Sequence, residues 1–190
     1  TDFVQALRDH PHLDPQLHAN PLLFTLLAAL WLTNPTRRLP ETQAELYRAA
    51  VDLLLDRWTR RRLPDPSVAE WLGLAPEQLR PLLETLAYTV HASEEATIRH
   101  GGQESAAQQD PTTFPIETLL LLLYRSGYLG HTTEISDYLT QKAGILISTE
   151  PEQFRFSHRS FQEHLAACEL ICSEPTKRQP PIDPMRHFPH

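Results

Sequence analysis

The spacing of apolar positions changes once near the end of the chain, and the change separates a predicted strand from a predicted helix. Phe154 and Phe156 alternate with polar residues, as in a half-buried strand. The apolar positions that follow recur at helical spacing. Ser160 followed by Glu163 is a capping-box pattern, which predicts a helix that begins at Ser160. His158 therefore lies where a strand meets a helix N-terminus, and free backbone N–H groups and the helix dipole favour an anion there.

Helical spacing also dominates the first third of the chain. Asn20 and Pro21 have the residue types of an N-cap and a first helical position, and they precede a leucine-rich run over 22–32. A second capping box, Thr42 followed by Glu45, predicts the start of the next helix. These signals predict two adjacent helices, each with a broad apolar face.

The rest of the chain predicts a longer series of elements. We expect an exposed polar insertion over 93–113, because this stretch is rich in glycine and polar residues. The periodic patterns predict helices over 67–72, 76–90, 116–125 and 135–142, strands over 145–148 and 154–158, and a last helix that fades by 173. Helices followed by a hairpin and a final helix are typical of a winged-helix domain, with the hairpin as its wing.

The fold class predicted is therefore mainly α: a helical bundle followed by a winged-helix domain with one small β-hairpin. Pro64-Asp65-Pro66 is the best domain boundary in the chain. It divides a helical domain over 1–63 from a winged-helix domain over 64–173. The proline-containing segment 174–190 has no periodic pattern and is interpreted as a linker or tail.

Composition narrows the choice of partners and compartment. The chain of 190 residues is 41% hydrophobic and carries a net charge of −7, which disfavours nucleic acid as the main partner. Cys168 and Cys172 lie one helical turn apart, a poor geometry for a disulfide, so a reducing compartment such as the cytoplasm is expected. No apolar run reaches the roughly 20 residues of a membrane span, so no membrane association is expected.

Three sequence blocks together resemble the C-terminal half of a NACHT-type signalling NTPase. This STAND class includes NOD-like receptors and bacterial antiphage proteins. The blocks are residues 20–28 (NPLLFTLLA), 39–58 (LPETQAELYRAAVDLLLDRW) and 156–167 (FSHRSFQEHLAA). The third block is the most specific, and His164 departs from it because the family usually has an aromatic residue there. The resemblance covers about residues 15–172.

The resemblance implies a nucleotide domain, a helical domain, a winged helix and a sensor region in that order. The chain contains no G-x-x-x-x-G-K-[ST] motif, so the P-loop and the Mg²⁺ site of an ATPase are expected upstream of residue 1. The resemblance also implies that Pro21 packs against the adenine and that His158 reaches the β-phosphate of bound ADP. No catalytic residue and no metal ligand is expected in this chain.

The implied function is regulatory. The chain would close over ADP and control ATP-dependent activation in defence or stress signalling. Its partners would be the nucleotide-binding domain and the sensor region of the same parent chain, with homo-oligomers formed on activation.

Two other functions stay open at this point. A DNA-binding winged-helix transcriptional regulator is one, although the candidate recognition helix over 133–142 carries two acids and one base. An interaction scaffold that has lost its nucleotide role is the other.

Each singled-out residue also has a plainer interpretation. On this interpretation, Pro21 would serve only as the first residue of a helix, His158 would only satisfy a backbone hydrogen-bonding group, and Arg159 would be a solvated surface residue. Three residues at helical spacing offer metal-ligand chemistry but lie too far apart on one helix for tetrahedral closure, so the two cysteines among them are interpreted as small buried apolar residues. These residues are His164, Cys168 and Cys172.

Overall fold

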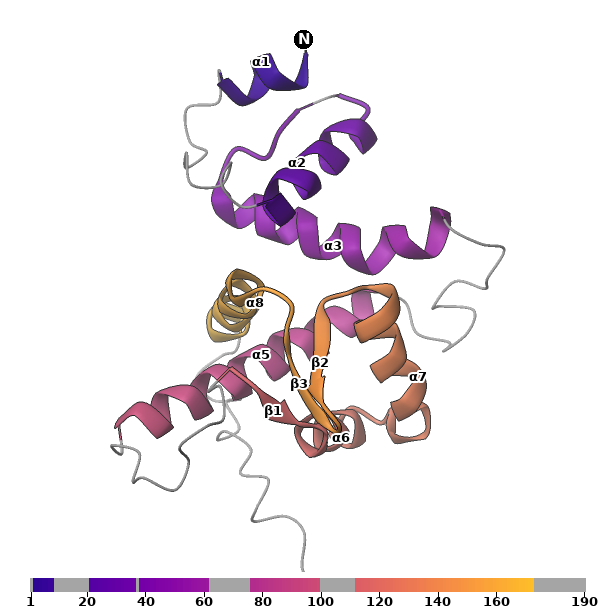
Figure 1. The fold of residues 1–190 in the computed structure, drawn as a ribbon, viewed down its shortest axis with the longest axis vertical. Coiled ribbons are helices and arrows are strands. Elements are labelled where there is room, and N and C mark those ends of the chain that lie inside the picture. Colours follow the sequence, from indigo (N-terminus) through magenta and orange to yellow (C-terminus); the bar gives the residue numbers. More distant parts are fainter. Residues whose placement is uncertain (1, 9–20, 37, 62–75, 100–111, 173–190) are drawn as a thin grey trace, which may run out of the picture. The chain divides into compact units, whose positions relative to one another are not determined.

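A computed structural model describes residues 2–8, 21–36, 38–61, 76–99 and 112–172 (Figure 1). The chain divides into two compact units, Thr1–Trp58 and Thr59–His190, and each is considered by itself. The proposed boundary at 64–66, the helix expected over 67–72 and the tail over 174–190 all lie outside the described residues.

The first unit contains helices α1 (Phe3–Arg8) and α2 (Pro21–Thr33) and most of α3 (Gln43–Arg61). The α2 helix begins at Pro21 as predicted and ends at Thr33, just before the second Asn-Pro pair. Its side chains buried in the core recur at helical spacing: Leu23, Leu26, Leu27 and Trp31. The ring of Phe3 on α1 packs against Phe24 and Trp31 of α2, with centroid separations of 5.8 Å and 6.0 Å. Burial of apolar surface thus positions these two helices.

The start of α3 confirms the predicted capping box. The Oγ1 atom of Thr42 accepts a hydrogen bond from the Glu45 N–H at 3.1 Å. The returning bond is displaced by one residue, because the Glu45 carboxylate accepts from the N–H of Glu41 at 2.9 Å. Two N–H groups near the helix start are satisfied in this way.

The second unit combines helices with a small sheet (Figure 1). The helices and helical turns are α5 (Pro76–Arg99), α6 (Ile116–Arg125), η2 (Leu129–His131), α7 (Thr132–Asp137), η3 (Tyr138–Lys142) and α8 (Arg159–Cys172). Among these elements α5 and α8 share the most extensive contact. The fold class is confirmed as mainly helical with a winged-helix domain.

The sheet has three antiparallel strands in the order β1-β3-β2. The strands β2 (Leu146–Glu150) and β3 (Gln153–Phe156) form the predicted hairpin. The third strand, β1 (Phe114–Pro115), was not predicted; it pairs with β3 through Phe114 opposite Phe154. The Phe114 ring lies 6.3 Å from the ring of Phe154 and 6.2 Å from that of Phe156, which anchors the strand in the core.

The turn between β2 and β3 is strained at one residue. Glu152 adopts a φ of 63°, in the left-handed region of the backbone map. This conformation is energetically unfavourable for any residue other than glycine. The carbonyl of Glu152 accepts a hydrogen bond of 2.8 Å from the N–H of Ile116, the first residue of α6. The turn of the wing therefore satisfies one of the free N–H groups at the start of α6.

Two other predictions need correction. The helix expected to end near residue 90 continues as α5 to Arg99, so the first part of the expected polar insertion is helical, and residues 100–111 lie outside the description. The short helix expected over 135–142 is instead α7 followed by the wider turn η3, which the Ala143 N–H closes on the Tyr138 carbonyl at 2.8 Å. Apolar spacing alone does not register such a change of helical pitch.

Candidate functional site

His158 occupies the position before the first residue of α8. The helix begins at Arg159, so the predicted start at Ser160 is wrong by one residue. The capping-box assignment fails with it, because the His158 side chain supplies the acceptor at this helix start. Its Nδ1 atom accepts a hydrogen bond from the Ser160 N–H at 3.3 Å. An imidazole therefore does here what a serine or threonine oxygen does at most helix starts.

This bond decides which ring nitrogen of neutral His158 carries the proton. An acceptor at Nδ1 has no hydrogen, so the neutral ring is protonated at Nε2. Nε2–H is then a hydrogen-bond donor, which matches an anionic oxygen.

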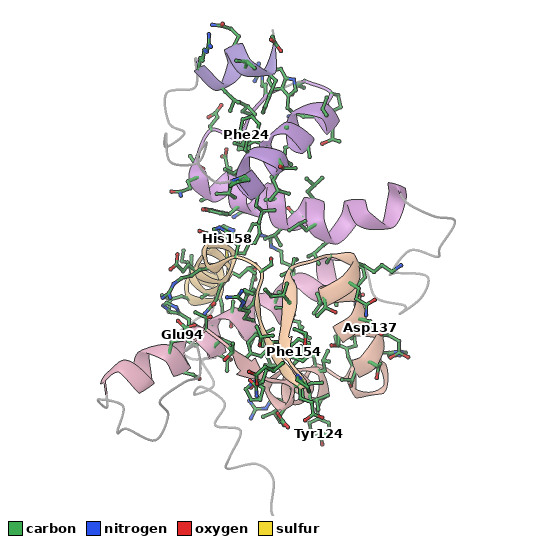
Figure 2. All side chains as sticks on the ribbon, viewed as in Figure 1. Phe24, Glu94, Tyr124, Asp137, Phe154 and His158 are labelled. Carbon is green, nitrogen blue, oxygen red and sulfur yellow. The ribbon has the colours of Figure 1, made fainter. Side chains whose placement is uncertain are left out.

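The surroundings hold the imidazole without enclosing it. His158 is half-buried, and its ring meets the fully buried Phe161 ring edge-on at 6.1 Å and 68°. The preceding residue is fixed as well, because the Ser157 N–H donates to the Ile145 carbonyl at 2.8 Å. Figure 2 shows His158 where the chain passes from the hairpin into α8. The hairpin precedes His158 as predicted, and the ring is not sealed inside the core.

Arg159 and Glu163 form an ion pair along the first turn of α8. The Arg159 Nε lies 3.0 Å from a Glu163 carboxylate oxygen. The prediction that Glu163 caps the helix start is therefore wrong, because its carboxylate pairs with Arg159 instead. Arg159 was expected to be plain surface, and its side chain is indeed more than half exposed. Its Nη2 also lies 3.6 Å from the Oε2 atom of Glu94 on α5, so the guanidinium reaches a buried carboxylate.

A buried polar pair joins α8 to α5 close to His158. The Gln162 Nε2 donates a hydrogen bond of 2.7 Å to Oε1 of Glu94, and both side chains are almost wholly inaccessible. Sequence reasoning missed both residues. A signal was present for Gln162, because it lies between Phe161 and Leu165 on the apolar face of its helix, where a glutamine needs a buried partner. No comparable signal singled out Glu94.

Pro21 is the first residue of α2 and is exposed. Its carbonyl accepts a hydrogen bond of 2.7 Å from the Thr25 hydroxyl. The predicted cap, Asn20, lies outside the described residues. Pro21 belongs to the first unit and His158 to the second, so the surroundings of each residue are described separately.

The first unit contains an open hollow of about 520 Å³ between the end of α2 and the start of α3. The loop on one side is held by Asn34, whose Oδ1 accepts from the Thr36 N–H at 2.9 Å and whose Nδ2 donates to the Arg38 carbonyl at 3.0 Å. Pro21 does not line this hollow, so the hollow and the predicted adenine contact are different surfaces.

The two cysteines of α8 do not match the buried apolar interpretation. Cys168 is half-buried and Cys172 is exposed, so the prediction that both are buried is wrong. The Cys168 Sγ lies 3.7 Å from Nε2 of His164, one turn earlier. Within the described parts of the chain, no three histidine, cysteine or acidic side chains are grouped so that they could hold a metal ion.

The surfaces that would meet DNA in a winged-helix regulator are acidic. Asp137 is exposed near the end of α7 (Figure 2), and Glu134 lies one turn before it. Glu150 and Glu152 are exposed at the turn of the wing. Elements that enter a DNA groove meet phosphates and need basic side chains, so this surface does not fit that role.

The comparison with known families identifies the fold and its context. The family model described as "Winged helix-turn-helix domain C-terminal to NACHT" matches residues 43–170. The chain belongs to this family. No curated protein and no solved structure matches the chain.

Membership states what comes before this domain. It is a winged-helix domain that follows a NACHT NTPase. NACHT association implies a nucleotide and an association with the NACHT domain within one chain. Among the helices that the structure describes, none is both long enough and apolar enough to cross a bilayer.

Proposed function

We propose that this NACHT-associated chain closes over ADP bound by the preceding NACHT domain and thereby holds a signalling NTPase in its inactive form. Exchange of ADP for ATP, or a trigger at a sensor region, would release the contact and permit assembly into homo-oligomers. A ligand changes such an equilibrium by binding the two conformations unequally. Hydrolysis and Mg²⁺ binding belong to the NACHT domain, and this chain contributes contacts only.

The observation that carries the proposal is the position and hydrogen bonding of His158. Its Nδ1 is tied to the Ser160 N–H at the start of α8, which directs the proton to Nε2. A half-buried N–H donor at a helix N-terminus suits an oxygen of the ADP β-phosphate, because the helix dipole favours negative charge at the same place.

Pro21 would supply the second contact. Its ring is exposed at the start of α2, where an apolar face can pack against an adenine. This contact contributes affinity without sensing the phosphate, so Pro21 would hold ADP and ATP alike. Discrimination between the two nucleotides would rest on His158.

The same proposal covers the cellular setting. We place the protein in a reducing cytoplasm, in defence or stress signalling of the NOD-like receptor type. The two free cysteines of α8 and the NACHT association support this setting.

The test is the rate of ADP release from the chain carrying its NACHT domain. We expect His158→Ala to accelerate release of a fluorescent ADP analogue roughly tenfold, since a hydrogen bond to a charged group contributes about 1.5–3 kcal/mol. His131→Ala is the matched control, because His131 is an exposed histidine elsewhere in the same unit. Equal release rates for His158→Ala and the unaltered protein would show that His158 is no phosphate contact.

A further inference from the structure

Gln162 connects His158 to the interior of the winged-helix unit through two hydrogen bonds. Its backbone N–H donates to the His158 carbonyl at 3.4 Å, alongside the Phe161 N–H at 3.0 Å. Its side chain donates to Glu94 on α5 at 2.7 Å. A hydrogen-bonded path from α5 to His158 therefore runs through the buried side chain of Gln162.

Toward the other end of α8, the Thr85 hydroxyl of α5 donates a hydrogen bond of 3.4 Å to the Glu169 carboxylate, while the buried side chains of the two helices are mostly apolar. The buried apolar residues include Leu83, Leu86 and Val90 on α5, and Phe161 and Leu165 on α8, and the two helices share an extensive contact. Apolar contacts tolerate small displacements of one helix along another, because the hydrophobic effect is not directional. A hydrogen bond to a buried carboxylate does not tolerate such displacements, because breaking the bond leaves a buried charge without a partner.

The Glu94 carboxylate has both oxygens engaged at the first turn of α8. Oε1 accepts from Gln162, and Oε2 lies 3.6 Å from the Arg159 guanidinium. Glu94 itself is only 5% exposed and Gln162 only 1%. A buried polar pair of this kind contributes directional specificity that an apolar pair lacks.

We propose that Glu94 and Gln162 are positioning residues, which set the first turn of α8 on α5 and so fix the direction in which the His158 imidazole offers its Nε2–H. The pair does not touch the nucleotide. It acts through the His158 backbone and through the Ser160 N–H that holds Nδ1. Only the expected effect of the pair on ADP release rests on the proposed function.

A charge exchange between the two positions provides the test. Gln162→Glu alone places two buried carboxylates at hydrogen-bond distance, which is strongly unfavourable. Glu94→Gln combined with Gln162→Glu restores an amide facing a carboxylate, with the positions reversed and Arg159 within the same turn. Glu163→Gln is the control, because it removes an exposed carboxylate from the same turn and leaves the buried pair intact.

Two measurements separate positioning from the proposed function. The first is the imidazole nitrogen spectrum of His158 in this chain, identified by its loss in His158→Ala. It reports which ring nitrogen carries the proton. The second is the ADP release rate from the chain carrying its NACHT domain.

For Gln162→Glu we expect a mixture of ring tautomers at His158 and ADP release about three- to tenfold faster. The double variant is expected to restore the Nε2-protonated ring and a release rate within about twofold of the unaltered protein. Glu163→Gln is expected to change neither measurement. If Gln162→Glu does not fold, Glu94→Leu gives the same comparison, since it removes the carboxylate and leaves a neutral amide.

An unchanged His158 spectrum in Gln162→Glu, or in Glu94→Leu if that variant is used, would overturn the positioning role. So would a folded double variant that fails to restore the spectrum. If the spectrum responds as expected but His158→Ala does not alter ADP release, the positioning role stands and the proposed nucleotide contact is wrong.

Discussion

The helices α2 and α8 carry the two proposed nucleotide contacts, and they begin in different ways. At the start of α2, Pro21 has no N–H to satisfy, and the helix is placed by its buried leucines and by Phe3 packing on Phe24. At the start of α8, His158 accepts a backbone hydrogen bond, and Gln162 binds a buried carboxylate. The first helix start rests on apolar packing, and the second adds directional hydrogen bonds to apolar packing.

The difference indicates how each contact would behave. A proline face against an adenine needs no particular angle, so apolar packing is sufficient to present it. A hydrogen bond to a phosphate weakens steeply when the angle is wrong, so the imidazole needs directional support. The polar pair between α5 and α8 would supply that support to His158.

The largest expected effect tests whether α8 also depends on apolar burial. Phe161 is fully buried, and Phe161→Ala is expected to lower the free energy of unfolding by about 3–5 kcal/mol. Urea denaturation followed by circular dichroism would measure it. Phe24→Ala on α2 is the matched control: Phe24 is 40% exposed, and we expect a loss of about 1 kcal/mol from its ring contact. Equal losses would remove the contrast between these two aromatic positions.

A second variant measures what a single side-chain acceptor contributes to a helix start. Thr42 Oγ1 accepts from the Glu45 N–H at the start of α3, so Thr42→Ala is expected to cost about 1 kcal/mol of stability. Thr42→Ser keeps the oxygen and should remain within about 0.5 kcal/mol of the unaltered chain. A destabilised Thr42→Ser with a neutral Thr42→Ala would contradict the hydrogen-bond explanation.

The smallest effect is expected at Pro21. Pro21→Ala removes no hydrogen bond donor, and it increases the freedom of the unfolded chain, so stability should fall by only about 0.4–1 kcal/mol. Thermal unfolding of the two chains would measure this. A loss above about 2 kcal/mol would mean that the Pro21 ring is packed into the fold, and the proposed contrast with α8 would no longer hold.

Local signals predicted much of the fold. The Asn-Pro pair located the start of α2, the Thr42 and Glu45 pair located the start of α3, and alternation of Phe154 and Phe156 located β3. In each case the residues that form the signal lie within a few positions of each other along the chain. The interacting residues can therefore be identified from the sequence pattern alone.

The strand β1 and the start of α8 were not predictable in the same way. β1 consists of Phe114 and Pro115, too few residues for an alternating pattern, and it is a strand only because β3 pairs with it. At α8 the sequence offered Ser160 and Glu163 as a capping box, yet Glu163 pairs with Arg159 and an imidazole takes the capping role. Competing partners of similar strength make such local assignments uncertain.

The place of His158 between a strand and a helix follows from the order of residues alone, because a change of apolar period is a local property. The bond from Gln162 to Glu94 depends instead on how α8 lies against α5. Along the chain these two helices are separated by all three strands and by the helices α6 and α7. A pattern along one helix records that a polar residue is buried, but only the packed structure supplies its partner. The desolvation cost of a buried amide and carboxylate requires that such a partner exist.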